Sequence, residues 1–280
     1  MDLVDSDDNV KQLFETICEL WKQYKSAPNR YKGPYTSFFQ GSGCGKTRSV
    51  LELVKHLKLC YLCCRAEDSE SQPVRSKVVL DALYGAIKES ASMDIIKTIQ
   101  LFLLACLEVV AERVRDQEQG DREAAEQMGR EQVQTGNGFG NGFMNGGSHI
   151  SSHRTNLFIS EKDWKPILER FQHYRLERVW TQPILERINQ YAGSTPLLLV
   201  FDEAGDLVKH EVLEVSYFRW IRRALAGCNS VFLIFMDTMS RISYFSPSQR
   251  TDPSLRVGFG VRPGASFELQ KYVHLGIHGE

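Results

Sequence analysis

Residues 35–57 constrain the fold more than any other part of this chain, because they fit one compact unit of strand, glycine-rich turn and helix. Residues 35–39 (YTSFF) are aromatic and predict a short buried strand. Residues 40–47 (QGSGCGKT) match the pattern G-x-x-x-x-G-K-[ST] except at Gln40, where the first glycine is expected. A helix with apolar residues on one side is predicted over about residues 46–57. This order is the context that a phosphate-binding loop requires.

The residue types of this loop suit an anionic phosphate. Small residues allow successive backbone N–H groups to turn toward one anion, and the candidates are Gly41, Ser42, Gly43, Cys44 and Gly45. Lys46 adds a positive charge for the β- and γ-phosphates, and the Thr47 hydroxyl is a hard oxygen ligand suited to Mg²⁺. The alternative is a glycine-rich turn that binds no ligand, and Gln40 leaves the first turn of the loop open.

A second signal is the run LLLVFDE at residues 197–203. Five consecutive apolar residues predict a strand buried on both faces, as central parallel strands are. Asp202 and Glu203 then emerge at the carboxyl edge of the sheet, where doubly wound folds hold their ligands. We expect Asp202 to hold Mg²⁺ and Glu203 to act as the general base that activates water. An ordinary solvated turn is the alternative.

A third segment has the same form. Residues 231–236 (VFLIFM) predict another buried strand, followed by the polar stretch 237–240. Asp237 or Thr238 is a candidate to help hold the attacking water, and a plain turn is the alternative. The predicted catalytic residues are therefore Glu203, Lys46, Asp237 and Thr238. Candidates for an arginine that stabilises the transferring phosphate are Arg241, Arg250 and Arg256, and the sequence does not select among them.

The remaining patterns divide the chain into segments. Helical spacing of apolar residues predicts a helix over residues 9–25, within an N-terminal segment 1–30. Residues 31–116 and 156–256 form the two halves of one α/β domain, separated by a low-complexity insertion at 117–155 that we expect to be disordered, and residues 257–280 form an irregular tail. Within the halves we predict a strand at 57–65 and helices at 76–91, 93–116, 160–174 (capped by Ser160), 179–191 and 211–226. The last of these carries Arg219, Arg222 and Arg223, some of which fit a solvated face.

Composition excludes several classes of protein. With 34 basic and 35 acidic residues, the 280-residue chain has no overall field to attract nucleic acid. Neither a signal peptide nor a membrane-spanning run is evident, so we expect an intracellular protein of the cytoplasm or nucleus. The seven cysteines are irregularly spaced and suit reduced, buried thiols. Cys60 and Cys63 fit a buried strand better than a metal or redox site, which would need a second ligand pair.

With these motifs in order, the chain resembles the P-loop NTPases that carry a catalytic glutamate, the class that contains the AAA-type and STAND-type ATPases. The resemblance rests on residues 40–47, 202–203 and 237–240. A narrower likeness, through residues 38–47, 61–65 and 235–240, is to the NTPase module of Crinkler-type proteins of fungi and oomycetes. The resemblance implies a doubly wound, mostly parallel sheet of the P-loop type, and ATP or GTP with Mg²⁺ as substrate and cofactor. No ubiquitin-like header or nuclease-type effector segment is visible, so effector activity is not implied.

Three functions follow as hypotheses. The first is Mg²⁺-dependent hydrolysis of ATP or GTP. The second is a module that binds nucleotide, turns it over slowly and controls a protein partner or its own self-association. The third is a P-loop kinase, which ranks lowest because two adjacent carboxylates at a strand end favour water as the phosphate acceptor.

Overall fold

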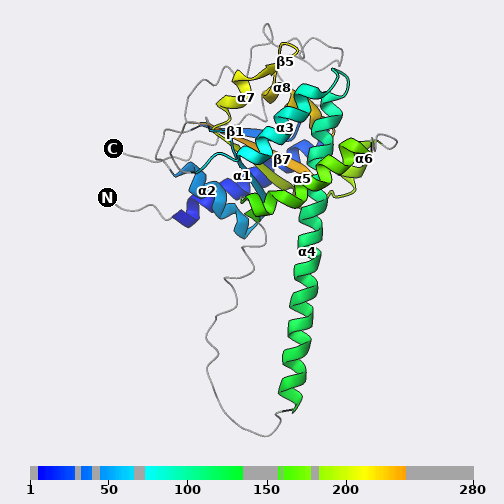
Figure 1. The fold of residues 1–280 in the computed structure, drawn as a ribbon. Coiled ribbons are helices and arrows are strands. Elements are labelled where there is room, and N and C mark those ends of the chain that lie inside the picture. Colours follow the sequence, from blue (N-terminus) through cyan, green and yellow to red (C-terminus); the bar gives the residue numbers. More distant parts are fainter. Residues whose placement is uncertain are drawn as a thin grey trace, which may run out of the picture.

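The computed structural model describes residues 6–28, 33–39, 45–65, 73–134, 157–158, 160–177 and 183–237. Its centre is a five-stranded sheet in the order β1-β7-β4-β2-β3 (Figure 1). The strands are β1 (Tyr35–Phe39), β2 (Leu59–Cys63), β3 (Leu157–Phe158), β4 (Leu197–Asp202) and β7 (Val231–Asp237). All four pairs of neighbouring strands are parallel. The predicted mixed α/β class with a mostly parallel sheet is confirmed.

Helices cover both faces of this sheet. In β4, Leu199 and Phe201 join the core on one face, while Leu198 and Val200 join the core on the other. The first face packs against α3 (Lys77–Glu89), α4 (Ile95–Gln134), α5 (Glu161–Leu176), α6 (Ile184–Asn189), α7 (Gly205–Lys209) and α8 (Tyr217–Ala224). The second packs against α1 (Ser6–Ser26), α2 (Lys46–Glu52) and the 3₁₀ turn η2 (Leu53–Lys55). Burial on two sides explains why the strands are apolar without alternation.

Local sequence rules account for two of these helices. The spacing that predicted a helix at 9–25 is confirmed, because Val10, Leu13, Ile17 and Tyr24 of α1 are all buried against the sheet. Helix α5 begins with the expected cap. The Ser160 side chain accepts from the Asp163 N–H, and the Asp163 carboxylate accepts from the Ser160 N–H at 3.0 Å.

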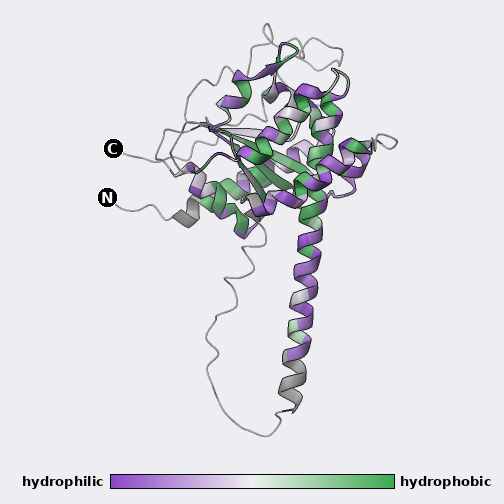
Figure 2. Ribbon diagram, in the orientation of Figure 1, coloured by the Kyte–Doolittle hydropathy of each residue, from purple (hydrophilic) through white to green (hydrophobic). Residues whose placement is uncertain are grey.

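Helix α4 corrects the predicted insertion. It continues through Gln134, so the expected disorder of residues 117–155 is wrong for 117–134, while 135–156 lie outside the described residues. Alanine, glutamate, glutamine and arginine are strong helix formers, and Gln117 bonds to Asp121 at 2.7 Å one turn later. The outer half of α4 projects from the domain (Figure 1) and is mainly hydrophilic (Figure 2). Polar composition was therefore a sign of exposure rather than of disorder.

Residues 211–226, predicted as one helix, contain a hairpin and a shorter helix. β5 (Glu211–Val212) pairs antiparallel with β6 (Val215–Ser216), and α8 begins only at Tyr217. The two turn residues, Leu213 and Glu214, have φ of 53° and 61°, which a right-handed helix cannot accommodate. Ser216 then caps α8 by accepting from the Arg219 N–H at 3.4 Å.

This turn gives a stability prediction. Non-glycine residues in the left-handed region are strained by about 1–2 kcal/mol each, and a two-residue hairpin turn of this kind favours Asn-Gly. Changing Leu213→Asn together with Glu214→Gly should raise the free energy of unfolding by about 1–2 kcal/mol, measured by urea denaturation. Glu214→Ala is the control, because alanine keeps the strained Cβ. Equal stability of the double variant and wild type would contradict the explanation.

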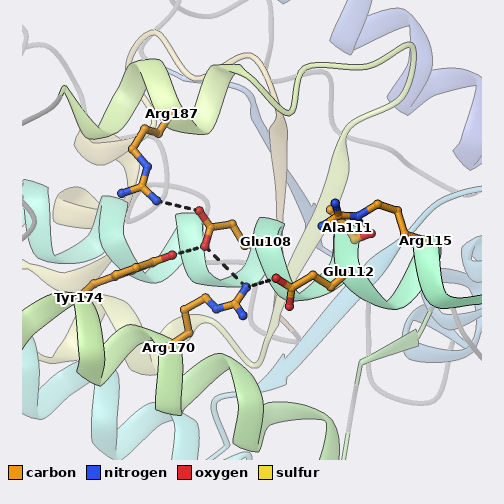
Figure 3. A network of polar contacts seen from close by, with 7 residues as sticks. All are labelled: Glu108, Ala111, Glu112, Arg115, Arg170, Tyr174 and Arg187. Carbon is orange, nitrogen blue, oxygen red and sulfur yellow. Dashed lines mark hydrogen bonds and ion pairs between the residues drawn. The ribbon is translucent and has the colours of Figure 1, made fainter.

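A polar network holds α4, α5 and α6 together (Figure 3). Glu108 of α4 pairs with Arg187 of α6 at 3.0 Å and with Arg170 of α5 at 3.6 Å. It also accepts a hydrogen bond from the Tyr174 hydroxyl. Burial, then the bond to Glu108 and its charge, raise the pKa of Tyr174 to about 12, so the phenol stays protonated and donates. One carboxylate therefore contacts three side chains of two neighbouring helices, through two hydrogen bonds and one ion pair.

Five of the six cysteines that the structure describes are buried free thiols, and Cys18 is half-buried. Cys60 and Cys63 of β2 lie on opposite faces of the sheet, Cys60 in the core of the first face and Cys63 in that of the second. Two side chains on opposite faces cannot hold one metal ion or form one disulfide, so the buried-strand interpretation is confirmed. Among the helices of the described residues, none combines the length and apolar character needed to cross a bilayer.

Candidate functional site

The predicted polar residues that the structure describes come together at the carboxyl edge of the sheet. In the sheet order β7 lies between β1 and β4, so the ends of these three strands are neighbours. Phe39, the last residue of β1, is paired with Asp237 of β7, and Cys63 of β2 is paired with Asp202 of β4. Parallel strands bring their carboxyl ends to one edge, where ligands of open α/β sheets bind.

The start of α2 reaches this edge through Thr47. The Thr47 hydroxyl donates to Oδ2 of Asp202 at 3.0 Å, across 155 positions of sequence. Gly45 precedes the helix with φ of 77°, a conformation that favours glycine, and its carbonyl accepts the Ser49 N–H at 2.9 Å. Lys46 is the first helical residue and is only 6% exposed. The loop motif and the acidic strand end are therefore in direct contact.

Tyr61 of β2 is a second donor to the same carboxylate. Its hydroxyl donates to Oδ2 of Asp202, and the tyrosine is 1% exposed. Burial, followed by the negative charge of Asp202 and the bond to it, raises the pKa of Tyr61 well above its ordinary value. Tyr61 thus remains a neutral phenol. Asp202 is 3% exposed, and these hydroxyls compensate its carboxylate for the loss of water.

Glu203 leaves β4 in an uncommon conformation. Its φ is 54°, in the left-handed region that glutamate seldom adopts, and its N–H donates to Oδ1 of Asp202 at 2.9 Å. The side chain is 24% exposed and pairs with Arg65, Oε1 to Nη2, at 3.4 Å. Strained backbone of this kind is frequent at functional sites. The Glu203 carboxylate is therefore accessible to water and in contact with a guanidinium group.

Arg75 fixes the backbone that carries Arg65. Its Nη1 donates to the carbonyl of Cys64 at 3.1 Å and to the carbonyl of Arg65, and it pairs with Oδ2 of Asp206 in α7 at 3.4 Å. Its side chain is only 12% exposed. Arg75 therefore joins the end of β2, which leads to Arg65, to the start of α7, which follows Glu203.

Asp237 lies against the turn that follows Glu203. A Cβ placed on Gly205 would lie 2.5 Å from Oδ2 of Asp237, so only glycine allows the carboxylate to approach this closely. The Ala204 N–H donates to the carbonyl of Met236 at 2.8 Å and holds the two strand ends together. Asp237 is 6% exposed. It is therefore next to the Glu203 turn, as its position at a strand end predicted.

Several predicted residues lie outside the described part of the chain. These are Gln40, Gly41, Ser42, Gly43 and Cys44 of the loop, Thr238 and its neighbours to 240, and the three candidate arginines Arg241, Arg250 and Arg256. Of the arginines on α8, Arg222 is 3% exposed, so it does not belong to a solvated face. Its Nη1 lies 3.5 Å from the Tyr35 hydroxyl.

The donor set fits a hard divalent cation bound together with a phosphate. The described residues contain no group of three His, Cys, Asp or Glu side chains that could hold a metal by themselves. Mg²⁺ is commonly held by one or two protein oxygen groups with phosphate oxygens and water completing its shell. The Thr47 hydroxyl and the Asp202 carboxylate, 3.0 Å apart, are such a pair.

Sequence reasoning missed Tyr61, Gly205 and Arg75. Tyr61 stands in an apolar run, where an aromatic residue is usual, and nothing in the run marks its hydroxyl. Gly205 follows the acidic pair by two positions, and that spacing was the available signal for a close approach. Arg75 is distant in sequence from every motif, so only the fold reveals it.

Comparison with known proteins gives a family and no activity. A family model described as "Domain of unknown function (DUF8735)" matches residues 5–258. Neither the curated proteins nor the solved structures yield a match.

Proposed function

Because the chain belongs to the DUF8735 family, whose description assigns no activity, we propose from its site geometry that it binds and hydrolyses a nucleoside triphosphate with Mg²⁺. ATP is the expected nucleotide, with GTP as the alternative. The proposed fold is of the P-loop NTPase type, and the narrower relation to the Crinkler NTPase module belongs to the same proposal. The observation that carries it is the 3.0 Å hydrogen bond from Thr47 to Asp202, which joins two motifs that lie 155 positions apart in the sequence.

Each residue of the proposed site has a role that its chemistry allows. Backbone N–H groups of the loop and the Lys46 ammonium would bind the phosphates, and Thr47 and Asp202 would hold Mg²⁺. The bound ion would offset negative charge on the β- and γ-phosphate oxygens. Glu203 would accept a proton from water as the water oxygen attacks the γ-phosphorus. The bond from that phosphorus to the bridging oxygen breaks, and the nucleoside diphosphate leaves with the electron pair. Asp237, with Thr238, would help to hold the water.

The first test is equilibrium binding of a fluorescent ATP analogue with Mg²⁺. Lys46→Ala should weaken the affinity by about 10- to 100-fold, the scale of one lost charge-assisted hydrogen bond. Lys58→Ala removes the same charge from an exposed position just before β2, at the opposite edge of the sheet, and as the control it should change the affinity by less than about twofold. If Lys46→Ala bound the analogue with wild-type affinity, this loop would be excluded as the binding site.

One observation favours a second candidate, a nucleotide-controlled module with slow turnover. Arg65 pairs with Oε1 of Glu203 at 3.4 Å, so a guanidinium group already occupies one oxygen of the proposed base. Such a protein would bind nucleotide with little phosphate release and change its association with a partner or with itself. Sedimentation velocity with and without Mg²⁺–nucleotide separates the two candidates. An unchanged sedimentation coefficient together with steady phosphate release supports hydrolysis alone.

A further inference from the structure

Every oxygen of Asp202 already has an assigned donor. Oδ1 accepts the Glu203 N–H at 2.9 Å, and Oδ2 accepts the hydroxyls of Thr47 and Tyr61. Asp202 is 3% exposed, so its carboxylate depends on these protein donors. The orientation of this carboxylate is thus set by three groups, and two of them, Thr47 and Glu203, are already in the proposed machinery.

Tyr61 comes from outside that machinery. It lies on β2 opposite Val200 of β4, and its ring is part of the core beneath α1 and α2. That core includes Val50 and Leu53 from the segment that follows Thr47. A ring held on all sides has one orientation, so its hydroxyl is aimed at Asp202 by packing. Tyr61 therefore connects the position of α2 to the orientation of the Asp202 carboxylate.

The Thr47 hydroxyl has one hydrogen, and it donates this hydrogen to Oδ2 of Asp202. Both of its lone pairs then face away from the carboxylate, and a lone pair is what a metal ion requires. If Oδ2 turned away, the Thr47 hydroxyl would lose the partner that orients it. A second donor on Oδ2 prevents this rotation.

We propose that Tyr61 is a positioning residue for Mg²⁺, acting through Asp202 to keep the Thr47 oxygen available to the ion. The inference rests on the proposed nucleotide-binding function and adds a residue to it. Tyr61 touches neither nucleotide nor ion in this assignment. Loss of the Tyr61 hydroxyl should weaken nucleotide binding in the presence of Mg²⁺ and leave nucleotide binding without Mg²⁺ unchanged.

The test is the ratio of two dissociation constants for a fluorescent ATP analogue, one measured in excess EDTA and one in excess Mg²⁺. In Tyr61→Phe, which removes only the hydroxyl, the gain in affinity from Mg²⁺ should fall by about tenfold, the scale of one hydrogen bond to a charged group. Affinity in EDTA should match wild type, while the thermal midpoint should fall, because the buried Asp202 carboxylate loses a donor. A merely structural role would instead weaken nucleotide binding in EDTA and in Mg²⁺ by the same factor.

Two variants sharpen the result. Tyr217→Phe is the control, because Tyr217 is fully buried and its hydroxyl has no hydrogen-bond partner among the described residues. It should leave both constants unchanged. Asp202→Asn should remove the Mg²⁺ gain, and adding Tyr61→Phe to it should remove nothing further, because Tyr61 acts through that carboxylate.

The outcomes separate this inference from the function on which it rests. A wild-type protein whose nucleotide affinity does not respond to Mg²⁺ would overturn both. A wild-type response that Tyr61→Phe keeps in full would overturn the role of Tyr61 alone, as would additive effects of Tyr61→Phe and Asp202→Asn.

Discussion

Glu203→Gln is expected to lower the rate of phosphate release at saturating Mg²⁺–ATP by about 10²- to 10⁴-fold, the usual contribution of a general base. Glutamine keeps the size of the side chain and its place after β4, but its amide cannot take a proton from water at neutral pH. The hydrogen bond to the Asp202 carboxylate is donated by the backbone N–H of Glu203, so the substitution does not remove it. Nucleotide affinity should therefore stay within about twofold of wild type.

The matched control for this variant is Glu211→Gln, which removes the same charge from an exposed position in the β5–β6 hairpin. It should release phosphate at the wild-type rate. Rates are best measured by single-turnover phosphate release, which isolates the chemical step from product dissociation. A Glu203→Gln rate within about threefold of wild type would exclude Glu203 as the base, because even a weak general base contributes more.

Glu108→Ala is expected to have the largest effect on stability, lowering the free energy of unfolding by about 2–3 kcal/mol. The Glu108 side chain is 12% exposed, accepts hydrogen bonds from Arg187 and Tyr174 and forms an ion pair with Arg170, so its removal leaves a buried phenol without its acceptor and two guanidinium groups without their shared counter-charge. The arginines are 24% and 28% exposed, so water compensates part of the loss and keeps the cost below that of a fully buried pair. The thermal midpoint should fall by roughly 5–10 °C.

Glu112→Ala is the control for this change, one turn further along the same helix. It has the same effect on helix propensity, but the Glu112 side chain is 45% exposed and pairs with Arg170 at 2.8 Å. A loss of about 0.5 kcal/mol or less is expected for it. If urea denaturation gave the two variants the same free energy of unfolding, the contacts of Glu108 would be excluded as the main source of stability in the packing of α4, α5 and α6.

The buried strands were the most predictable part of the fold. Residues 197–202 and 231–237 carry runs of apolar residues. Short apolar runs without alternation are typical of parallel strands that are buried on both faces of a sheet. The hairpin at 211–216 was missed because its turn is made by Leu213 and Glu214 rather than by the Asn-Gly pair that marks such turns. The extent of α4 was missed because a helix without an apolar side looks the same in sequence as a solvated loop.

In the candidate site, the residues could be predicted from the sequence but their contacts could not. Lys46, Thr47, Asp202, Glu203 and Asp237 could be predicted because each stands beside a glycine-rich turn or a buried strand. The contacts that orient them could not, since they depend on which strands become neighbours. The bond from Tyr61 to Asp202 exists because β2 lies beside β4, and the pair of Arg65 with Glu203 has the same origin. Strand order is a property of the whole sheet, and no local pattern encodes it.

Helix α4 also shows where the cooperative unit of this protein ends. Its first half is buried among α5, α6 and α8, whereas the described side chains from Arg115 to Gln127 are exposed apart from Gln117. The helix is continuous from its buried half to its exposed half. We expect the buried turns to lose their hydrogen bonds only when the domain unfolds, and the exposed turns to fray one at a time from the outer end. The thermodynamic edge of the domain therefore falls inside a continuous helix, at a point fixed by packing.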